Sequence, residues 1–222
     1  MIYLFENPGQ IGEEMLARML LFLPPQRREK AVAYRYAIDQ KMSALAYLLL
    51  GFGLRKEYGI QDPPLFSYGE KGKPRLAAYP AIHFNLSHCK RAVACVISKE
   101  AAGIDAECVL PFEMALAERI CKQSELKAIL ASDRPDIAFT RLWTEKESVM
   151  KYTGEGLRDD VREVLTDVRL SRQTWISDSG QGLYALTVAY PAHRKAPIER
   201  IYLTLGDLVD YLDHQLPSPP VN

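Results

Sequence analysis

The stretch LWTEKESVMKYTGEGL, from Leu142 to Leu157, gives the clearest local structural signal in this chain. Good helix formers run up to Lys151, and Gly154 then supplies a residue that readily ends a helix. At about 100° per residue, one side of this predicted helix is apolar, and Lys146 falls near its middle. The apolar members of that side are Phe139, Leu142, Trp143, Val149 and Met150. Because an unpaired buried charge is costly, Lys146 needs an anionic partner, which a carboxylate or a substrate phosphate could supply.

Composition limits the kind of protein. The 222 residues are 48% hydrophobic and 25% charged, which suits one large globular domain or two small ones. Lys plus Arg balances Asp plus Glu at 28 each, so we expect neither nucleic acid nor an anionic membrane as a partner. The first ten residues, MIYLFENPGQ, lack signal-peptide features, and no window is apolar enough to span a bilayer, so we expect a cytoplasmic protein. Four cysteines without C-x-x-C spacing indicate buried free thiols rather than a zinc or disulfide framework.

The order of predicted elements favours an α+β fold. There is no strict β-α alternation and no Gly-rich fingerprint after the first strand, which argues against a doubly wound sheet. Residues 62–80 read as a loop, and Asp39 as the N-cap of a long buried helix. The strands are expected at 1–6, 81–86, 92–98, 102–107, 161–170, 183–189 and 200–205, and the helices at 11–22, 39–59, 113–131, 142–151 and 206–216.

Two acids in AAGIDAECV could hold a metal ion. The run Gly103 to Val109 alternates as a strand does, so Asp105 and Glu107 should share one face about 7 Å apart along the chain. Two carboxylates on one face repel each other unless a cation lies between them, and Mg²⁺ prefers such hard oxygen ligands. The alternative is an exposed strand face carrying two solvated acids.

Glu147 and Lys151 lie four residues apart on the predicted helix. Such a pair is most often a surface ion pair. If Glu147 instead faces Asp105 and Glu107, three acids could hold one metal while Lys146 and Lys151 contact a phosphate chain.

Other polar residues are candidates for phosphate contacts. The basic stretches RREK (27–30) and KGKPRL (71–76) are either solvated charge clusters or parts of a local anion site. Ser87 and His88 follow directly after the predicted strand 81–86, and because adjacent residues of an extended chain point apart, a catalytic dyad is disfavoured. A phosphate contact or a role in a turn suits His88 better.

Taken in order, KGKPRL, FNLSH, GIDAE and LWTEKESVMKYTGEGL resemble the motifs of the Sfp-type 4′-phosphopantetheinyl transferases. The resemblance spans roughly residues 27–157. It implies a pseudo-dimer of two similar α+β lobes, with the active site and coenzyme A in the cleft between them. We place the lobes at residues 1–103 and 104–216, followed by a disordered tail at 217–222.

The resemblance also implies residue roles. Asp105, Glu107 and Glu147 match ligands of Mg²⁺, with Mn²⁺ as an alternative, and Glu147 is the candidate general base. Lys151 matches the lysine on the phosphate under attack. The predicted coenzyme A contacts are Arg27, Lys30, Lys73, Pro74, Ser87, His88, Lys146 and Lys151, with Arg27 and Lys30 at the 3′-phosphate. The sequence departs from the family at Met42, where an arginine is usual and Lys41 could substitute, and at Ala106, where a bulkier apolar residue is more common.

The implied activity is Mg²⁺-dependent transfer of the phosphopantetheine arm of coenzyme A to a serine of an apo acyl or peptidyl carrier protein. 3′,5′-ADP is released, and the enzyme would act as a monomer. The alternatives are another Mg²⁺-dependent phosphate-ester hydrolase and a silent module that binds coenzyme A or a carrier. Two further expectations are that Glu125 is an outer-shell or a fourth acid near the metal, and that apolar residues within 110–121 are core rather than a carrier-docking surface.

Overall fold

The computed structural model describes residues 1–154, 161–194 and 198–215. A four-stranded sheet lies at its centre, in the order β4 (His83–Cys89), β5 (Ala92–Ser98), β1 (Ile2–Glu6) and β9 (Arg200–Tyr202). Strand β1 runs antiparallel to β5, with Tyr3 opposite Cys95, and parallel to β9, with Ile2 opposite Arg200. Because both faces of β1 are buried, its sequence is a continuous apolar run rather than an alternating one.

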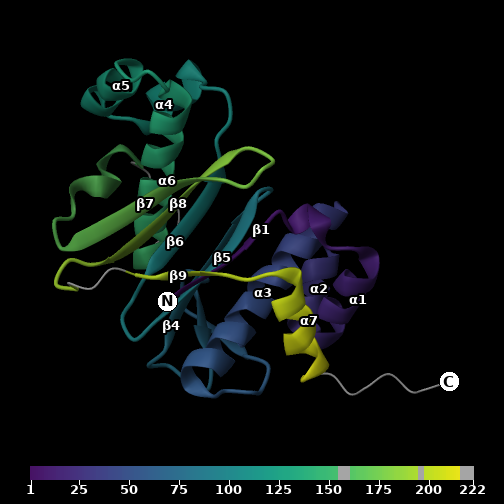
Figure 1. The fold of residues 1–222 in the computed structure, drawn as a ribbon. Helices are drawn as coiled ribbons and strands as arrows, with labels where there is room; N and C mark the ends of the chain where they lie inside the picture. The colour runs from purple at the N-terminus through teal and green to yellow at the C-terminus, as the bar shows by residue number, and fades with distance from the viewer. Residues whose placement is uncertain (155–160, 195–197, 216–222) are drawn as a thin grey trace.

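Helices cover one face of this sheet (Figure 1). They are α1 (Glu13–Phe22), α2 (Pro25–Val32), α3 (Ala37–Tyr58) and α7 (Leu205–Asp213), with a short 3-10 turn η1 (Pro8–Gln10) before α1. Tyr3 and Phe5 of β1 pack with the buried leucines of α3 in the largest hydrophobic cluster. Helix α3 ends at Gly59, whose left-handed φ of 68° suits glycine. It begins after Tyr36, so Asp39 lies in its first turn and the prediction of Asp39 as N-cap is wrong.

A second sheet packs on the opposite face of the first. It has the order β6 (Gly103–Cys108), β8 (Leu183–Pro191) and β7 (Leu170–Asp178). Its inner face packs on Ile2 and Leu4 of β1. Its outer face carries α6 (Pro135–Thr153), which is tied to β8 by a 2.7 Å hydrogen bond between the hydroxyls of Thr144 and Thr187. The order of layers is therefore helices, sheet, sheet, helix.

Side chains of β4 join the two sheets. The amide of Ile104 donates to Asn85 Oδ1 at 3.0 Å, and the amide of Ala106 donates to Ser87 Oγ at 3.1 Å. These bonds satisfy buried amides of β6 that would otherwise lack partners. They also hold β4 and β6 at a fixed register, and this register places Ser87 beside Asp105.

Three predicted elements differ from the structure. The predicted loop 62–80 contains a hairpin, β2 (Phe66–Tyr68) with β3 (Pro74–Leu76). The predicted helix 113–131 is two helices, α4 (Met114–Ile120) and α5 (Gln123–Leu130), because Cys121 adopts an extended conformation between them. The predicted strand 161–170 is mainly a 3-10 helix, η2 (Val161–Thr166), since the apolar residues there pack against α6 rather than pair with a strand.

The α+β prediction is confirmed, while the predicted boundaries of the two lobes stay a prediction. Strand β9 joins the sheet of β1, and α7 packs against α1, so residues 198–215 lie with the N-terminal elements. Periodicity does not tell which sheet edge a strand will join. The similarity of the two lobes stays a prediction. The predicted tail at 217–222 and residues 155–160 lie outside the described residues.

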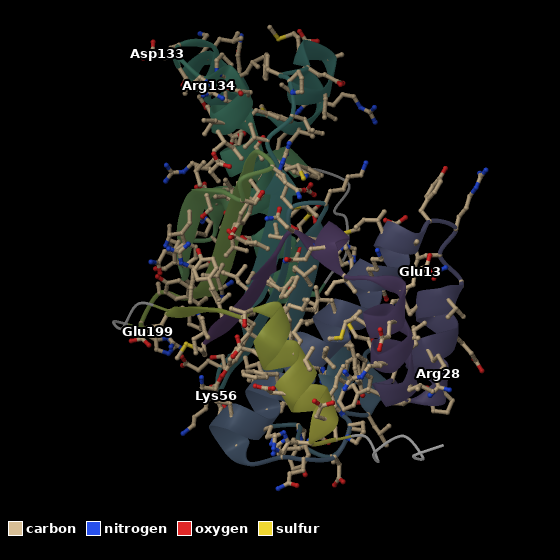
Figure 2. The ribbon with its side chains drawn as sticks, turned by 45° about the vertical axis from the view of Figure 1, so that its right-hand side comes forward. Glu13, Arg28, Lys56, Asp133, Arg134 and Glu199 are labelled. Carbon is tan, nitrogen blue, oxygen red and sulfur yellow. The ribbon has the colours of Figure 1, made fainter. Side chains whose placement is uncertain are left out.

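Charged residues lie on the surface of the structure, as expected for a chain with 25% charged residues. Charged side chains such as Glu13, Lys56 and Asp133 point outward (Figure 2). Among the residues that the structure describes, no helix is long and apolar enough to cross a bilayer.

Candidate active site

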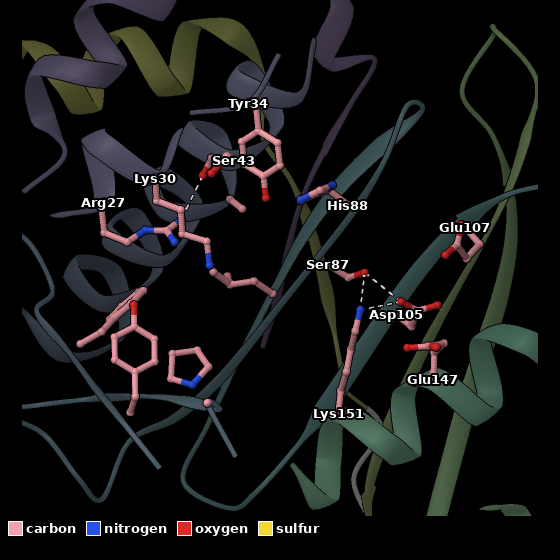
Figure 3. Close-up of a pocket in the computed structure, with 16 residues that line it drawn as sticks. Arg27, Lys30, Tyr34, Ser43, Ser87, His88, Asp105, Glu107, Glu147 and Lys151 are labelled. Atoms are coloured by element: carbon pink, nitrogen blue, oxygen red, sulfur yellow. Dashed lines mark hydrogen bonds and ion pairs between the residues drawn. The ribbon is translucent and has the colours of Figure 1, made fainter. Parts of the chain in front are cut away.

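One cavity of about 390 Å³ collects most of the predicted site residues (Figure 3). It opens between α2, the β2–β3 hairpin, β4, β6 and α6. Of the eleven residues predicted to bind coenzyme A or metal, all but Lys73 and Lys146 line it. Those present are Arg27, Lys30, Pro74, Ser87, His88, Asp105, Glu107, Glu147 and Lys151. Their proximity is structural, and their individual roles stay predictions.

A tight polar group forms the acidic side of the cavity. Lys151 of α6 lies 2.6 Å from Oδ1 of Asp105 on β6 and donates to Ser87 Oγ at 2.9 Å. Ser87 Oγ in turn donates to Asp105 Oδ1 at 3.0 Å. Each member comes from a different element, so the group exists only where β4, β6 and α6 meet.

Within the described residues, Glu107 and Glu147 have no ion pair like that between Asp105 and Lys151. Burial, with the charge of Asp105 adding to it, raises the pKa of Glu107 to about 7. Burial and Asp105 also raise the pKa of Glu147. The Lys151 ammonium opposes both shifts without cancelling them. Both carboxyls therefore hold a proton more readily than an ordinary glutamate, and a bound cation would oppose that effect.

The donor chemistry of these acids fits Mg²⁺. Oδ2 of Asp105 is buried and has no hydrogen-bond partner in the described part of the chain. Carboxylate oxygens are the ligands that Mg²⁺ prefers, together with phosphate oxygens and water. Within residues 1–154, 161–194 and 198–215, however, no group of three or more His, Cys, Asp or Glu is already arranged to hold a metal. Asp105, Glu107 and Glu147 thus fit the ion in type and burial without forming a preassembled cluster.

The opposite side of the cavity is basic, and its Arg27 side chain is held in place by two aromatic rings. The guanidinium carbon of Arg27 lies 5.7 Å from the ring centre of Tyr47 and 5.6 Å from that of Phe66. Its Nη2 donates to the carbonyl of Ser43 at 3.4 Å, while its Nε is buried and has no partner in the described part of the chain. Lys30, one turn further along α2, is exposed at the cavity rim. A guanidinium held by two rings and still holding an unused donor suits a phosphate group.

Lys73 and His88 lie along the walls. Lys73 borders an adjoining cavity of about 230 Å³, where it donates to the carbonyl of Tyr152 at 2.8 Å. Burial, with nearby Arg75, lowers the pKa of Lys73 to about 8. Burial and the charge of Lys151 lower the pKa of His88, so its imidazole is neutral at pH 7.

Lys146 does not line the cavity, and its predicted contact with coenzyme A stays a prediction. Its side chain is 0% exposed, and its ammonium lies 2.9 Å from the carboxylate of Glu125. Of the two partners predicted for Lys146, a carboxylate or a substrate phosphate, the structure confirms the carboxylate. Glu125 does not line the cavity, and its carboxylate contacts Lys146 and the amide of Lys122; its place near the metal stays a prediction.

Sequence reasoning missed other residues of the site. Gly103 allows α6 to approach β6, because a Cβ there would overlap backbone atoms of Ser148 and Tyr152. A glycine that opens a strand was the available signal. Asn85 lies within the FNLSH motif but was assigned no role; it orients β6. Tyr34 and Tyr68, which line the cavity, carried no sequence signal.

Two further expectations concern residues near the site. Lys41 does not line the cavity, and Met42 is buried in the helical core. The preference for core placement within 110–121 is wrong for Leu110, Met114 and Leu116, which are 63%, 43% and 41% exposed. Phe112 packs inward, with its ring centre 5.9 Å from that of Phe139, and Ala117, Ile120 and Cys121 are buried in the same cluster.

Comparison with known proteins identifies the family. Residues 101–195 match the 4′-phosphopantetheinyl transferase superfamily. The chain is 31% identical over 150 residues to the 4′-phosphopantetheinyl transferase Sfp of Bacillus subtilis (strain 168), which covers 66% of this chain and 67% of that protein. It is 33% identical over 156 residues to another 4′-phosphopantetheinyl transferase of Bacillus subtilis, with 68% of each chain covered. The chain belongs to the 4′-phosphopantetheinyl transferase superfamily.

This membership confirms both the predicted resemblance and the prediction of an enzyme of the phosphopantetheinyl transferase type. A longer alignment, 28% identical over 194 residues, extends to the 4′-phosphopantetheinyl transferase gsp of Aneurinibacillus migulanus and covers 86% of this chain. The family match at 101–195 contains β6 and α6, the two elements that carry Asp105, Glu107, Glu147 and Lys151.

Proposed function

We propose that the protein transfers the 4′-phosphopantetheine arm of coenzyme A to a serine of an apo acyl or peptidyl carrier protein, with release of 3′,5′-ADP. The observation that carries this proposal is the division of one cavity into a basic end at Arg27 and an acidic end at Asp105, Glu107 and Glu147. A cofactor with a terminal phosphate and a pyrophosphate could use both ends at once. We also propose that the enzyme works as a cytoplasmic monomer.

At the basic end, Arg27 and Lys30 would hold the 3′-phosphate of coenzyme A. The two aromatic rings fix the Arg27 guanidinium before binding, so little rotamer entropy is lost on contact. At the middle of the cavity, the neutral imidazole of His88 can donate one hydrogen bond without adding charge.

At the acidic end, Asp105, Glu107 and Glu147 would hold Mg²⁺. When bound, the ion supplies charge neutralisation at the pyrophosphate, as metal ions do in phosphoryl transfer. Lys151 already spans Ser87 and Asp105, so its ammonium is placed to contact the phosphate under attack.

The reaction forms one bond and breaks one bond at phosphorus. The carrier serine oxygen bonds to the β-phosphorus of coenzyme A, and the bond from that phosphorus to the oxygen of the 3′,5′-ADP leaving group breaks. Glu147 would accept the serine proton. Its carboxylate lines the acidic end of the cavity, where the phosphate under attack would lie.

The test is intact-mass spectrometry of an apo carrier protein incubated with this enzyme, coenzyme A and Mg²⁺. We expect a gain of one phosphopantetheine that disappears in EDTA and with Glu147→Gln. Consumption of coenzyme A without a labelled carrier would indicate a hydrolase instead. Intact coenzyme A across several carriers would indicate a silent binding module.

We further propose that the carrier docks on the exposed apolar surface of Leu110, Met114 and Leu116. This surface follows directly from β6, so it lies next to the strand that bears the acids. Leu116→Asp should raise KM for the carrier by about tenfold, since it removes an apolar contact and adds a charge, while the Kd for coenzyme A stays unchanged. Val168→Asp, at a site 90% exposed in η2–β7, is the matched control. An unchanged KM with Leu116→Asp would place the carrier elsewhere.

A further inference from the structure

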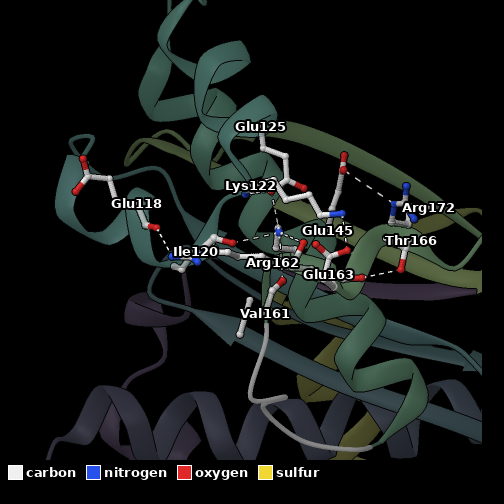
Figure 4. Close-up of polar contacts among 11 residues, drawn as sticks. Glu118, Ile120, Lys122, Glu125, Glu145, Val161, Arg162, Glu163, Thr166 and Arg172 are labelled. Carbon is white, nitrogen blue, oxygen red and sulfur yellow. Dashed lines mark hydrogen bonds and ion pairs between the residues drawn. The ribbon is translucent and has the colours of Figure 1, made fainter.

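The ammonium of Lys146 lies where several chain segments meet. Figure 4 labels Ile120, Glu125, Val161 and Arg162, which come from these segments. Besides the Glu125 carboxylate at 2.9 Å, the ammonium donates to the carbonyl oxygens of Ile120 at 3.2 Å, Val161 at 3.2 Å and Arg162 at 3.1 Å. These acceptors belong to the end of α4, the first turn of α5 and the start of η2. Because an ammonium has three hydrogens, four acceptors use its full donor capacity.

The surroundings make these contacts strong. Lys146 is completely buried, and the adjoining cluster of α4, α5 and α6 includes Ala117, Ile129 and Phe139. In such a low-dielectric setting a fully satisfied polar network is rigid, and a partly satisfied one is costly. Glu125 has a second duty, since its carboxylate accepts from the amide of Lys122 at 2.8 Å and so closes the start of α5. One carboxylate therefore both neutralises Lys146 and fixes the α4–α5 turn.

The same network is connected to two acids of the cavity. Lys146 immediately precedes Glu147 in α6. Glu107 lies near the end of β6, and only residues 109–113 separate that strand from α4. A shift of the α4–α5 hairpin relative to α6 would thus change the position of Glu107 relative to Glu147.

We propose that Lys146, with Glu125, is a positioning residue for the transfer reaction: it fixes the α4–α5 hairpin and η2 on α6, and so sets the spacing of Glu107 and Glu147. The inference rests on the proposed function, because it assigns these two acids to Mg²⁺. It excludes direct contact of Lys146 with coenzyme A.

The test compares Lys146→Met with the wild-type enzyme. Because outer-shell partners of metal ligands typically change metal affinity or activity by 10–100-fold, we expect kcat to fall about tenfold or more. The Mg²⁺ concentration for half-maximal rate should rise to a similar degree. The Kd for coenzyme A measured in EDTA should stay within about twofold, because Lys146 does not line the cavity. Hydrogen exchange should accelerate in α4 and α5. Lys127→Met, at an exposed site on α5, is the matched control.

Three results would overturn the inference. A higher Kd for coenzyme A with an unchanged Mg²⁺ requirement would make Lys146 a ligand. Faster hydrogen exchange with unchanged kcat and Mg²⁺ requirement would make the pair purely structural. Unchanged values in every assay would remove any role. If Lys146→Met does not fold, Glu125→Gln takes its place, because it removes the negative charge and keeps the side-chain shape.

Failure of the proposed function would be separate. If the wild-type enzyme modifies no carrier, that function is refuted, while calorimetric Mg²⁺ affinity and hydrogen exchange of the variants still decide the role of Lys146. Unchanged Mg²⁺ affinity would then overturn the inference by itself.

Discussion

Replacing Gly103 with alanine tests how closely α6 must approach the second sheet. A Cβ at position 103 would overlap the carbonyl oxygen of Ser148 and the amide nitrogen of Tyr152, and would lie 2.9 Å from the Tyr152 Cα. All three are backbone atoms of α6, so no side-chain rotation can relieve the contact. The helix must move away from β6, and Lys151 must move with it.

The cost follows from the packing. Inserting a methyl group into a well-packed core costs about 1–3 kcal/mol when side chains can adjust. Because backbone must move here, we expect the upper end, about 3 kcal/mol in free energy of unfolding. For a domain of this size, about 1 kcal/mol lowers Tm by roughly 2–4 °C, so Tm should fall by roughly 6–12 °C.

The assay is differential scanning calorimetry of Gly103→Ala beside Gly9→Ala. Position 9 has no atom within 4 Å of an added Cβ, so its substitution controls for the change in backbone entropy. Well below Tm, phosphopantetheine transfer by Gly103→Ala should also fall by about tenfold or more, because Lys151 loses its 2.6 Å contact with Asp105. A Tm within about 1 °C of the wild-type value would refute the reasoning, since it would show that α6 can yield without cost.

Three more predictions concern binding and stability. Lys73 has a pKa of about 8, so its side chain is charged below that pH and neutral above it. The phosphates of coenzyme A are already ionised at pH 7, so the charge lost from this contact between pH 7 and 9.5 is that of Lys73. The affinity for coenzyme A, measured by calorimetry, should therefore fall by roughly tenfold over that range. Lys73→Arg should abolish that fall, and a flat wild-type profile would contradict the assignment. Arg27→Ala should weaken coenzyme A binding by about tenfold or more with little change in kcat, because it removes a fixed phosphate partner; an unchanged Kd would remove Arg27 from the site. Tyr47→Phe deletes a 2.6 Å hydrogen bond to the buried carbonyl of Pro64 and should cost about 1–2 kcal/mol in thermal unfolding, and a Tm equal to wild type would show that water replaces the hydroxyl.

Short-range pattern was sufficient for much of the site. The alternation of Gly103 to Val109 placed Asp105 and Glu107 on one strand face, and the helical period placed Lys146 on the apolar side of α6. These results depend only on backbone geometry that repeats every two or 3.6 residues. The spacing of motifs also indicated the family, which the comparisons confirmed.

Long-range packing decided the rest. The apolar face of α6 required a partner for Lys146, but only the folded chain shows that Glu125 and three carbonyls supply it. The same holds for β9, whose apolar residues did not indicate that it would pair with β1 at the far end of the chain. Periodicity defines which residues share a face, whereas the surface that covers the face depends on residues distant in sequence. For this protein the sequence by itself determined the faces and the family, and the tertiary structure determined which charges meet.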